Sequence, residues 1–179
     1  MNTKMPTAAD AKEEEDYAVY SCLIDSWYVN KAIHLIVIED QTDLQLWGEK
    51  LEDWVADLPE ILPGGTTELV QDFVNKNKQS HLLKPLFVLK VPYVFITSRE
   101  MTDIFQIVGG EGWDEFYRRY PHSHGTITLS RPGFNAVGNQ SLVYIGNQLD
   151  WRAGSGHMVF LMKEEGAWKI LSKTMIWIS

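Results

Sequence analysis

The stretch "GSGHMVFLMKEEGAWKILSKTMIWIS", from Gly154 to Ser179, decides the fold class of this chain. It contains two apolar runs rich in β-branched and aromatic residues, 156–163 and 168–178, with only "EEGA" between them. A connection this short is typical of neighbouring antiparallel strands, because a parallel pair needs a long crossover. The sequence therefore predicts a β-hairpin here.

Working outward from this hairpin, two further strand-like runs precede it, at 125–130 and 141–146. The segments "PGFNAVGNQ" and "NQLDWRAGS" follow these runs and are rich in turn-forming residues. The C-terminal part is therefore predicted to be an antiparallel sheet of about four strands.

The upstream half has a mainly helical pattern. Thr7 and Asp10 fit a capping box for a helix that ends near Tyr28. Helical spacing of apolar residues predicts further helices at 44–58, 66–74, 98–105 and 113–120, with Thr66 and Ser98 as N-caps. Strands are expected at 34–40 and, as one or two strands around Pro92, at 86–98. The fold class is therefore α+β, with N-terminal helices and early strands in one domain over residues 1–179, of which 1–9 are expected to be frayed.

The composition narrows the classes of function. The 179 residues carry 16 Lys and Arg against 24 Asp and Glu, a formal net charge of −8. We do not expect nucleic-acid binding, because the sequence has no cluster of basic residues. Binding to anionic membranes is not expected either, because an acidic surface is repelled by anionic lipids. No apolar run approaches the roughly 20 residues of a membrane span. We expect a soluble cytoplasmic protein, with a removed signal peptide on a longer precursor left open.

A resemblance covers mainly Trp113 to Ser179. The runs "YPHSHG", "SRPGF", "GSGHMVF" and "GAW" resemble a loose group of uncharacterised bacterial proteins with YP-x-S-x-G, S-R-x-G-F, G-x-G-aromatic and G-x-W elements. That group has no established activity that would apply to this chain. The order of helices followed by an antiparallel sheet is also similar to the NTF2-like cone fold, which implies a cavity lined in part by the first helix.

Three histidines raise the question of a metal site. On a strand, His122 and His124 would point to the same face, and His157 on a later strand would be a third ligand. The alternative is local structure, in which Pro121 ends a helix and Gly125 permits a turn. We favour the second interpretation and expect no metal and no cofactor, since no cysteine or carboxylate stands at ligand spacing.

Other candidate residues are isolated in the sequence. Asp25 lies among apolar residues of the first helix, where it is either a buried acid with a raised pKa or a solvent-facing side chain. Arg131 and Arg152 flank strands and would either bind an anionic ligand or pair with surface acids. Cys22, the only cysteine, is expected to be a buried inert thiol.

These observations favour a small acidic binding or accessory protein without enzymatic activity, whose partner is an unknown small molecule or protein. A second hypothesis is an NTF2-like cavity enzyme, a hydratase, isomerase or hydrolase, which would draw on Asp25, His122, His124 or His157 for acid–base chemistry. A third is an immunity-type inhibitor of a basic partner. A homodimer stays open, since dimers are the commonest soluble oligomers.

Overall fold

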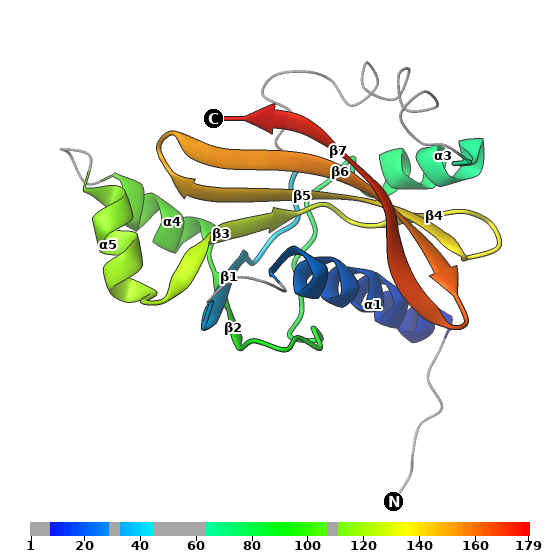
Figure 1. The fold of residues 1–179 in the computed structure, drawn as a ribbon, viewed down its shortest axis with the longest axis horizontal. Helices are drawn as coiled ribbons and strands as arrows, with labels where there is room; N and C mark the ends of the chain where they lie inside the picture. Colours follow the sequence, from blue (N-terminus) through cyan, green and yellow to red (C-terminus); the bar gives the residue numbers. More distant parts are fainter. Residues whose placement is uncertain (1–7, 29–32, 45–63, 107–110) are drawn as a thin grey trace, which may run out of the picture.

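The computed structural model describes residues 8–28, 33–44, 64–106 and 111–179. Within these residues the chain forms four helices and a mixed open sheet with strand order β2-β1-β3-β5-β6-β7, in which the short β4 pairs with β5 (Figure 1). The helices are α1 (Ala8–Tyr28), α3 (Thr67–Lys76), α4 (Ser98–Phe105) and α5 (Gly112–Arg119). The strands are β1 (Leu35–Glu39), β2 (Tyr93–Ile96), β3 (Ser123–Leu129), β4 (Gly133–Phe134), β5 (Gln140–Asp150), β6 (Ala153–Glu164) and β7 (Ala167–Ile178).

The predicted C-terminal antiparallel sheet is confirmed. β3 pairs with β5, β5 with β6, and β6 with β7, all antiparallel. Glu165 and Gly166 form the two-residue turn between β6 and β7, and both have positive φ, of 51° and 82°. Such turns match the twist of the flanking strands, which explains why "EEGA" connects them directly.

The early strands join the same sheet. β1 lies between β2 and β3 and is parallel to both. Its residues Ile36, Val37 and Ile38 are all buried, as expected for a strand covered on both faces. The α+β class is therefore confirmed, and the sheet is mixed.

Helices cover both faces of the sheet. On one face α1 contributes Tyr20, Leu23 and Ile24 to the largest apolar cluster. On the other face α3 packs over β5 and β6 at one end, while α4 and α5 pack on β1 and β2 at the other (Figure 1). Among the described residues no helix is long and apolar enough to cross a membrane.

Several boundaries differ from the sequence prediction. The 86–98 stretch contributes only β2, because residues before Tyr93 are irregular around Pro92. The N-cap of α4 is Thr97 and not Ser98, since Thr97 forms a complete capping box with Glu100. Thr66 caps α3 as predicted and accepts a hydrogen bond from Leu69 N. The predicted 44–58 helix and the Thr7 cap lie outside the described residues, apart from Leu44.

The alternation along β7 is also interrupted. The β6–β7 register shifts twice, so residues before and after each shift change face. Trp168 and Ile170 pack in the cluster under α1, whereas Ile176 packs in the α3 cluster. Strict alternation along the 168–178 run predicts that Trp168, Ile170 and Ile176 share one side of the sheet, and this prediction is wrong for Ile176. Trp177 donates to Tyr144 Oη on the α3 side, so the two tryptophans lie on opposite faces.

Candidate functional site

The three histidines considered as metal ligands contact different neighbours. His122 lies in the turn before β3 with φ of 64°, and its ring is 5.9 Å from that of His34. The ring of His124 lies 6.0 Å from that of Tyr28. His157, on β6, packs edge-on to Trp27, and burial lowers its pKa, with a smaller contribution from Lys173. The described residues contain no group of three His, Cys, Asp or Glu side chains able to hold a metal ion.

The structure also places Asp25, Arg152 and Cys22. Asp25 accepts a hydrogen bond from Lys90 N at 3.1 Å and lies 3.9 Å from Lys90 Nζ, so its carboxylate fastens the irregular segment before β2 to α1. Arg152 is exposed in the turn between β5 and β6. Cys22 donates to Trp168 O at 3.1 Å, and burial raises the pKa of its thiol.

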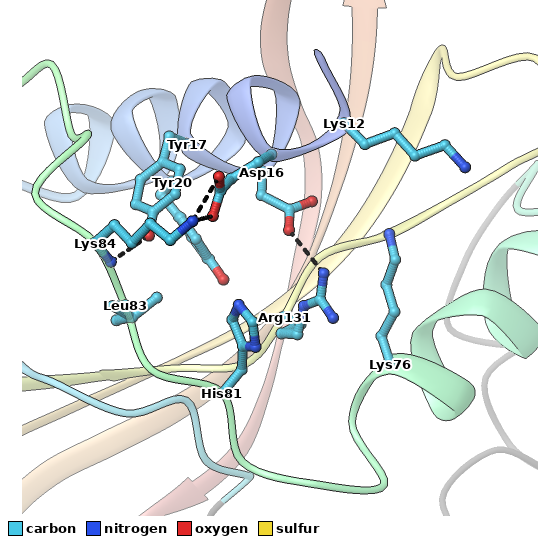
Figure 2. A pocket seen from close by; sticks show the side chains of 10 residues that line it. Lys12, Asp16, Tyr17, Tyr20, Lys76, His81, Leu83, Lys84 and Arg131 are labelled. Atoms are coloured by element: carbon cyan, nitrogen blue, oxygen red, sulfur yellow. Dashed lines mark hydrogen bonds and ion pairs between the residues drawn. The ribbon is translucent and has the colours of Figure 1, made fainter. Parts of the chain in front are cut away.

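Arg131, in contrast, enters a pocket of about 420 Å³ between α1 and the segments that precede β2 and β4 (Figure 2). The pocket is lined by Lys12, Glu13, Asp16, Tyr17, Tyr20, Lys76, His81, Leu83, Lys84 and Arg131. Its volume lies in the range of small-molecule sites, roughly 300–1,000 Å³. Of the sequence candidates, Arg131 is the one that lines this pocket.

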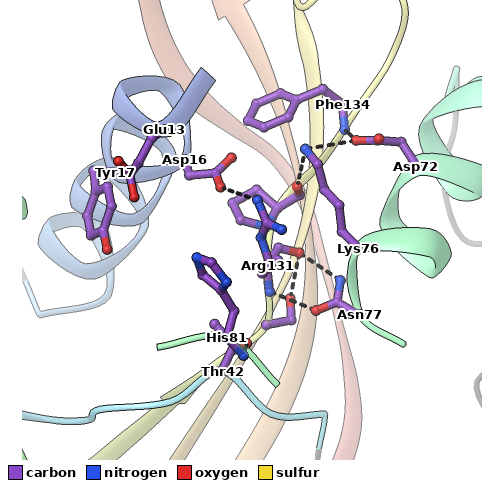
Figure 3. A network of polar contacts seen from close by, with 12 residues as sticks. Glu13, Asp16, Tyr17, Thr42, Asp72, Lys76, Asn77, His81, Arg131 and Phe134 are labelled. Atoms are coloured by element: carbon purple, nitrogen blue, oxygen red, sulfur yellow. Dashed lines mark hydrogen bonds and ion pairs between the residues drawn. The ribbon is translucent and has the colours of Figure 1, made fainter. Parts of the chain in front are cut away.

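The backbone around Arg131 is fixed by the end of α3 (Figure 3). The Asn77 side chain accepts from Arg131 N and donates to Arg131 O, both at 2.8 Å. Lys76 Nζ donates to Pro132 O at 3.1 Å, and Asp72 accepts from Phe134 N at 2.8 Å. Side chains of one helix therefore hold three of the four residues that follow Ser130 in "SRPGF".

Ser130 and Gly133 of this motif also make contacts that fix the backbone around Arg131. Tyr20 donates to Ser130 O at 3.0 Å from α1, and Ser130 Oγ accepts from Tyr144 N at 2.8 Å. Gly133 lies against Phe73, where an added Cβ would come within 2.6 Å of the Phe73 backbone nitrogen. Only glycine permits this close approach. The motif therefore fixes the position from which the Arg131 side chain extends.

One nitrogen of the Arg131 guanidinium donates to Asp16, and a second has no partner among the described residues. Its Nη2 donates to Asp16 Oδ2 at 3.3 Å, which is long for a charge-assisted hydrogen bond. Its Nε is buried and has no hydrogen-bond partner among the described residues. Because a guanidinium carries five N–H donors, it can bind a further acceptor without losing Asp16.

Asp16 is a buried acid, with a side chain that is 10% exposed. Burial raises its pKa, while Lys76, Arg131 and His81 lower it by a smaller amount. The desolvation of a carboxylate on α1 therefore outweighs the attraction of the cations around it. The pocket holds an acid that gains a proton more readily than an exposed aspartate.

The segment with His81 and Lys84, which forms one wall of the pocket, is bound to the end of β1 and to α1. Thr42, which follows β1, accepts from His81 N at 2.9 Å and donates its own N–H to His81 O at 2.9 Å. Tyr17 Oη accepts from Lys84 N, and Lys84 Nζ pairs with Glu13 at 2.6 Å. The segment that carries His81 and Lys84 is therefore held both by the end of β1 and by α1.

The lining has four Lys and Arg side chains against two acids, Glu13 and Asp16. This local excess of positive charge contrasts with the net charge of −8 for the whole chain. Chemically, the arrangement is suited to a small anion that accepts from Arg131, with Lys76 and His81 nearby.

Sequence reasoning missed Asp16 and His81. A signal for Asp16 was present, because it lies one helical turn before Tyr20, whose apolar stripe predicts a buried face. His81 had no such signal, since it follows a polar loop and is positioned by the distant Thr42.

Comparisons with known proteins add no functional information. No protein-family model matches the chain, and no match is found among curated proteins or solved structures.

Proposed function

We propose that this chain is a small acidic binding protein without catalytic activity, and that it binds a small anion in the Arg131 pocket. The observation that carries this proposal is Arg131 itself. Its backbone is fixed by Asn77, while its buried Nε has no partner among the described residues. Because the backbone of Arg131 is already fixed, binding of a carboxylate or phosphate would have to order only the side chain.

The surrounding charges support a ligand of this class. The net negative charge of the whole chain repels anions. The excess of Lys and Arg in the lining of this pocket attracts them locally. The negative charge of Asp16 beside Arg131 competes with an anionic ligand by repelling it, although the guanidinium has donors for both. Because burial raises the pKa of Asp16, this competition is weaker than an exposed aspartate would give.

The first experiment measures binding by thermal shift and calorimetry with acetate, inorganic phosphate and a panel of larger carboxylates. A ligand at 100 times its Kd stabilises the native state by about 2.7 kcal/mol, which is roughly 5–10 °C in Tm for a domain of this size. Arg131→Gln should abolish the shift. Arg152→Gln is the matched control, because Arg152 is exposed in the β5–β6 turn and does not line the pocket.

The outcomes separate the alternatives. Absence of any shift across the panel, or equal loss of binding in both arginine variants, contradicts an anion site at Arg131. Asp16→Asn should strengthen binding by removing the competing carboxylate. Weaker binding in that variant would mean that Asp16 contacts the ligand directly.

A second candidate function is the NTF2-like cavity enzyme. It is favoured by one observation, that Asp16 has a raised pKa and lines the same pocket as His81. Such a pair has the residue types of a general acid and base. Incubating each bound carboxylate with the protein and recovering it for NMR distinguishes the two functions. Recovery of an unchanged ligand supports binding, whereas turnover that is lost in His81→Gln supports catalysis.

A further inference from the structure

A second hollow adjoins the Arg131 pocket and shares Lys12 and Lys76 with it. Its volume is about 590 Å³, and it is lined by Lys12, Glu15, Glu68, Asp72, Lys76, Phe134, Asn135, Ala136, Val137 and Gly138. The apolar part of its wall comes from Phe134, Ala136 and Val137, at β4 and the turn that follows. The two hollows together form one groove that is cationic at its Arg131 end and partly apolar beyond Lys76.

The exposed apolar tip of this groove is held in place. Val137 is 80% exposed at the turn between β4 and β5. The Asn135 side chain accepts from Asn139 N at 3.0 Å and from Gln140 N at 3.1 Å, and Gly138 N donates to Asn135 O at 3.0 Å. Hydrogen bonds within the turn therefore keep an apolar side chain in solvent, beside the hollow.

Lys76 lies at the junction of the two hollows. Its Nζ is 4.5 Å from the centroid of the Phe134 ring and 3.0 Å from Asp72. The second hollow is lined by Lys12 and Lys76 and by three acids, of which Glu15 pairs with Lys163 and Asp72 with Lys76, whereas Glu68 has no ion pair among the described residues. A second anionic group on a ligand would therefore find no excess of cations there, whereas an uncharged tail would contact Phe134 and Val137.

We infer that the ligand is an amphipathic monoanion, with a single anionic head at Arg131 and an uncharged apolar tail that extends past Lys76 toward Val137. This inference rests on the proposed function and adds the class of ligand. The first hollow has an excess of cations and the second does not, which favours a ligand with one negative charge at one end of the molecule.

The experiment compares acetate, hexanoate, octanoate and octanedioate by calorimetry. Each methylene buried in the hollow should strengthen binding by about twofold to fourfold, so octanoate should bind at least about fiftyfold more tightly than acetate. Octanedioate should bind more weakly than octanoate, because the second hollow offers no excess of cations to offset the desolvation of its second carboxylate. Heptyltrimethylammonium, with the same seven-carbon tail as octanoate and a cationic head, should not bind.

Two exposed valines provide a matched pair of variants. Val137→Ser should reduce the dependence of affinity on chain length. Val88→Ser is the control, because Val88 is 82% exposed and lines neither hollow. Since both side chains face solvent, neither substitution is expected to unfold the protein.

Failure of this inference is distinguishable from failure of the proposed function. If acetate and octanoate bind equally well, the anion site stands and the apolar tail site is refuted. If affinity rises with chain length but Val137→Ser behaves like Val88→Ser, the tail does not lie at this turn and the inference is also refuted. If no anion binds at all, the proposed function itself is wrong.

Discussion

Glu39, the last residue of β1, is predicted to make the stability of this protein fall as the pH rises through neutrality. Its carboxyl accepts a hydrogen bond from Thr128 Oγ1 at 2.7 Å on the neighbouring strand. The pKa of Glu39 is raised to about 7, mainly by burial, with smaller effects from the Thr128 hydrogen bond, which lowers it, and from Asp43 and Asp40, which raise it. The perturbation that tests this is Glu39→Gln, which removes the charge and keeps an acceptor for Thr128.

The magnitude follows from the interval between the two pKa values. In the unfolded chain Glu39 titrates near 4.5, whereas in the folded state it titrates near 7. Between these values the folded state binds more protons than the unfolded state, so the free energy of unfolding decreases as the pH rises. At about 1.4 kcal/mol per pH unit, the contribution present below pH 4.5 and lost above pH 7 is about 3 kcal/mol.

The assay is urea unfolding of the parent and of Glu39→Gln at several pH values from 4.5 to 8, followed by tryptophan fluorescence. The two proteins should have similar free energies of unfolding at pH 4.5. At pH 8 the Gln variant should be more stable by up to about 3 kcal/mol, or roughly 6–12 °C in Tm. Titrating groups that do not interact with Glu39, including Asp16, are common to both proteins and cancel in the difference. A difference that stays constant from pH 4.5 to 8 would refute the reasoning.

Three further predictions concern stability and metal binding. Trp168→Ala should lower the free energy of unfolding by about 3–5 kcal/mol, because the side chain is only 7% exposed and packs against Phe134. Urea unfolding at fixed pH measures this loss, and a midpoint equal to that of the parent would contradict it. Gly125→Ala should destabilise the protein by several kcal/mol in the same measurement, since φ is +70° and the new Cβ would lie 2.0 Å from Gln148 O. Gly138→Ala, with φ of +75° and no atom within 4 Å, should lose only about 1–2 kcal/mol, and equal losses would show that the clash is relieved by movement. Zinc should leave the Tm unchanged, and replacing His122 and His124 together by Ala should be nearly neutral; a stoichiometric metal lost on that double substitution would overturn this expectation.

The sequence by itself determined the elements whose interactions are local. The β6–β7 hairpin follows from two apolar runs and a turn in which Gly166 and its neighbour adopt positive φ. α3 follows from its apolar stripe and from Thr66, whose hydroxyl caps the helix three residues on. In each case the stabilising contacts join residues close in sequence, so a pattern read along the chain contains the information.

Tertiary structure decided the sheet order and the faces of its residues. The parallel pairing of β1 with β2 and β3 joins segments separated by long stretches of chain, and no local pattern specifies which strands become neighbours. Register shifts between β6 and β7 move Ile176 to the face opposite Trp168. A shift of one residue exchanges the two faces, and it depends on the partner strand.

The candidate site was also predicted only in part from the sequence. Arg131 was a sequence candidate for anion binding, because an arginine beside a strand in "SRPGF" has suitable chemistry whatever its surroundings. Its partner Asp16 lies 115 residues away in the chain, and His81 reaches the same pocket from a third segment. The packing of α1 across the sheet brings these side chains together. That packing is set by many weak apolar contacts distributed over the whole core, which is why only the folded structure reveals the pocket.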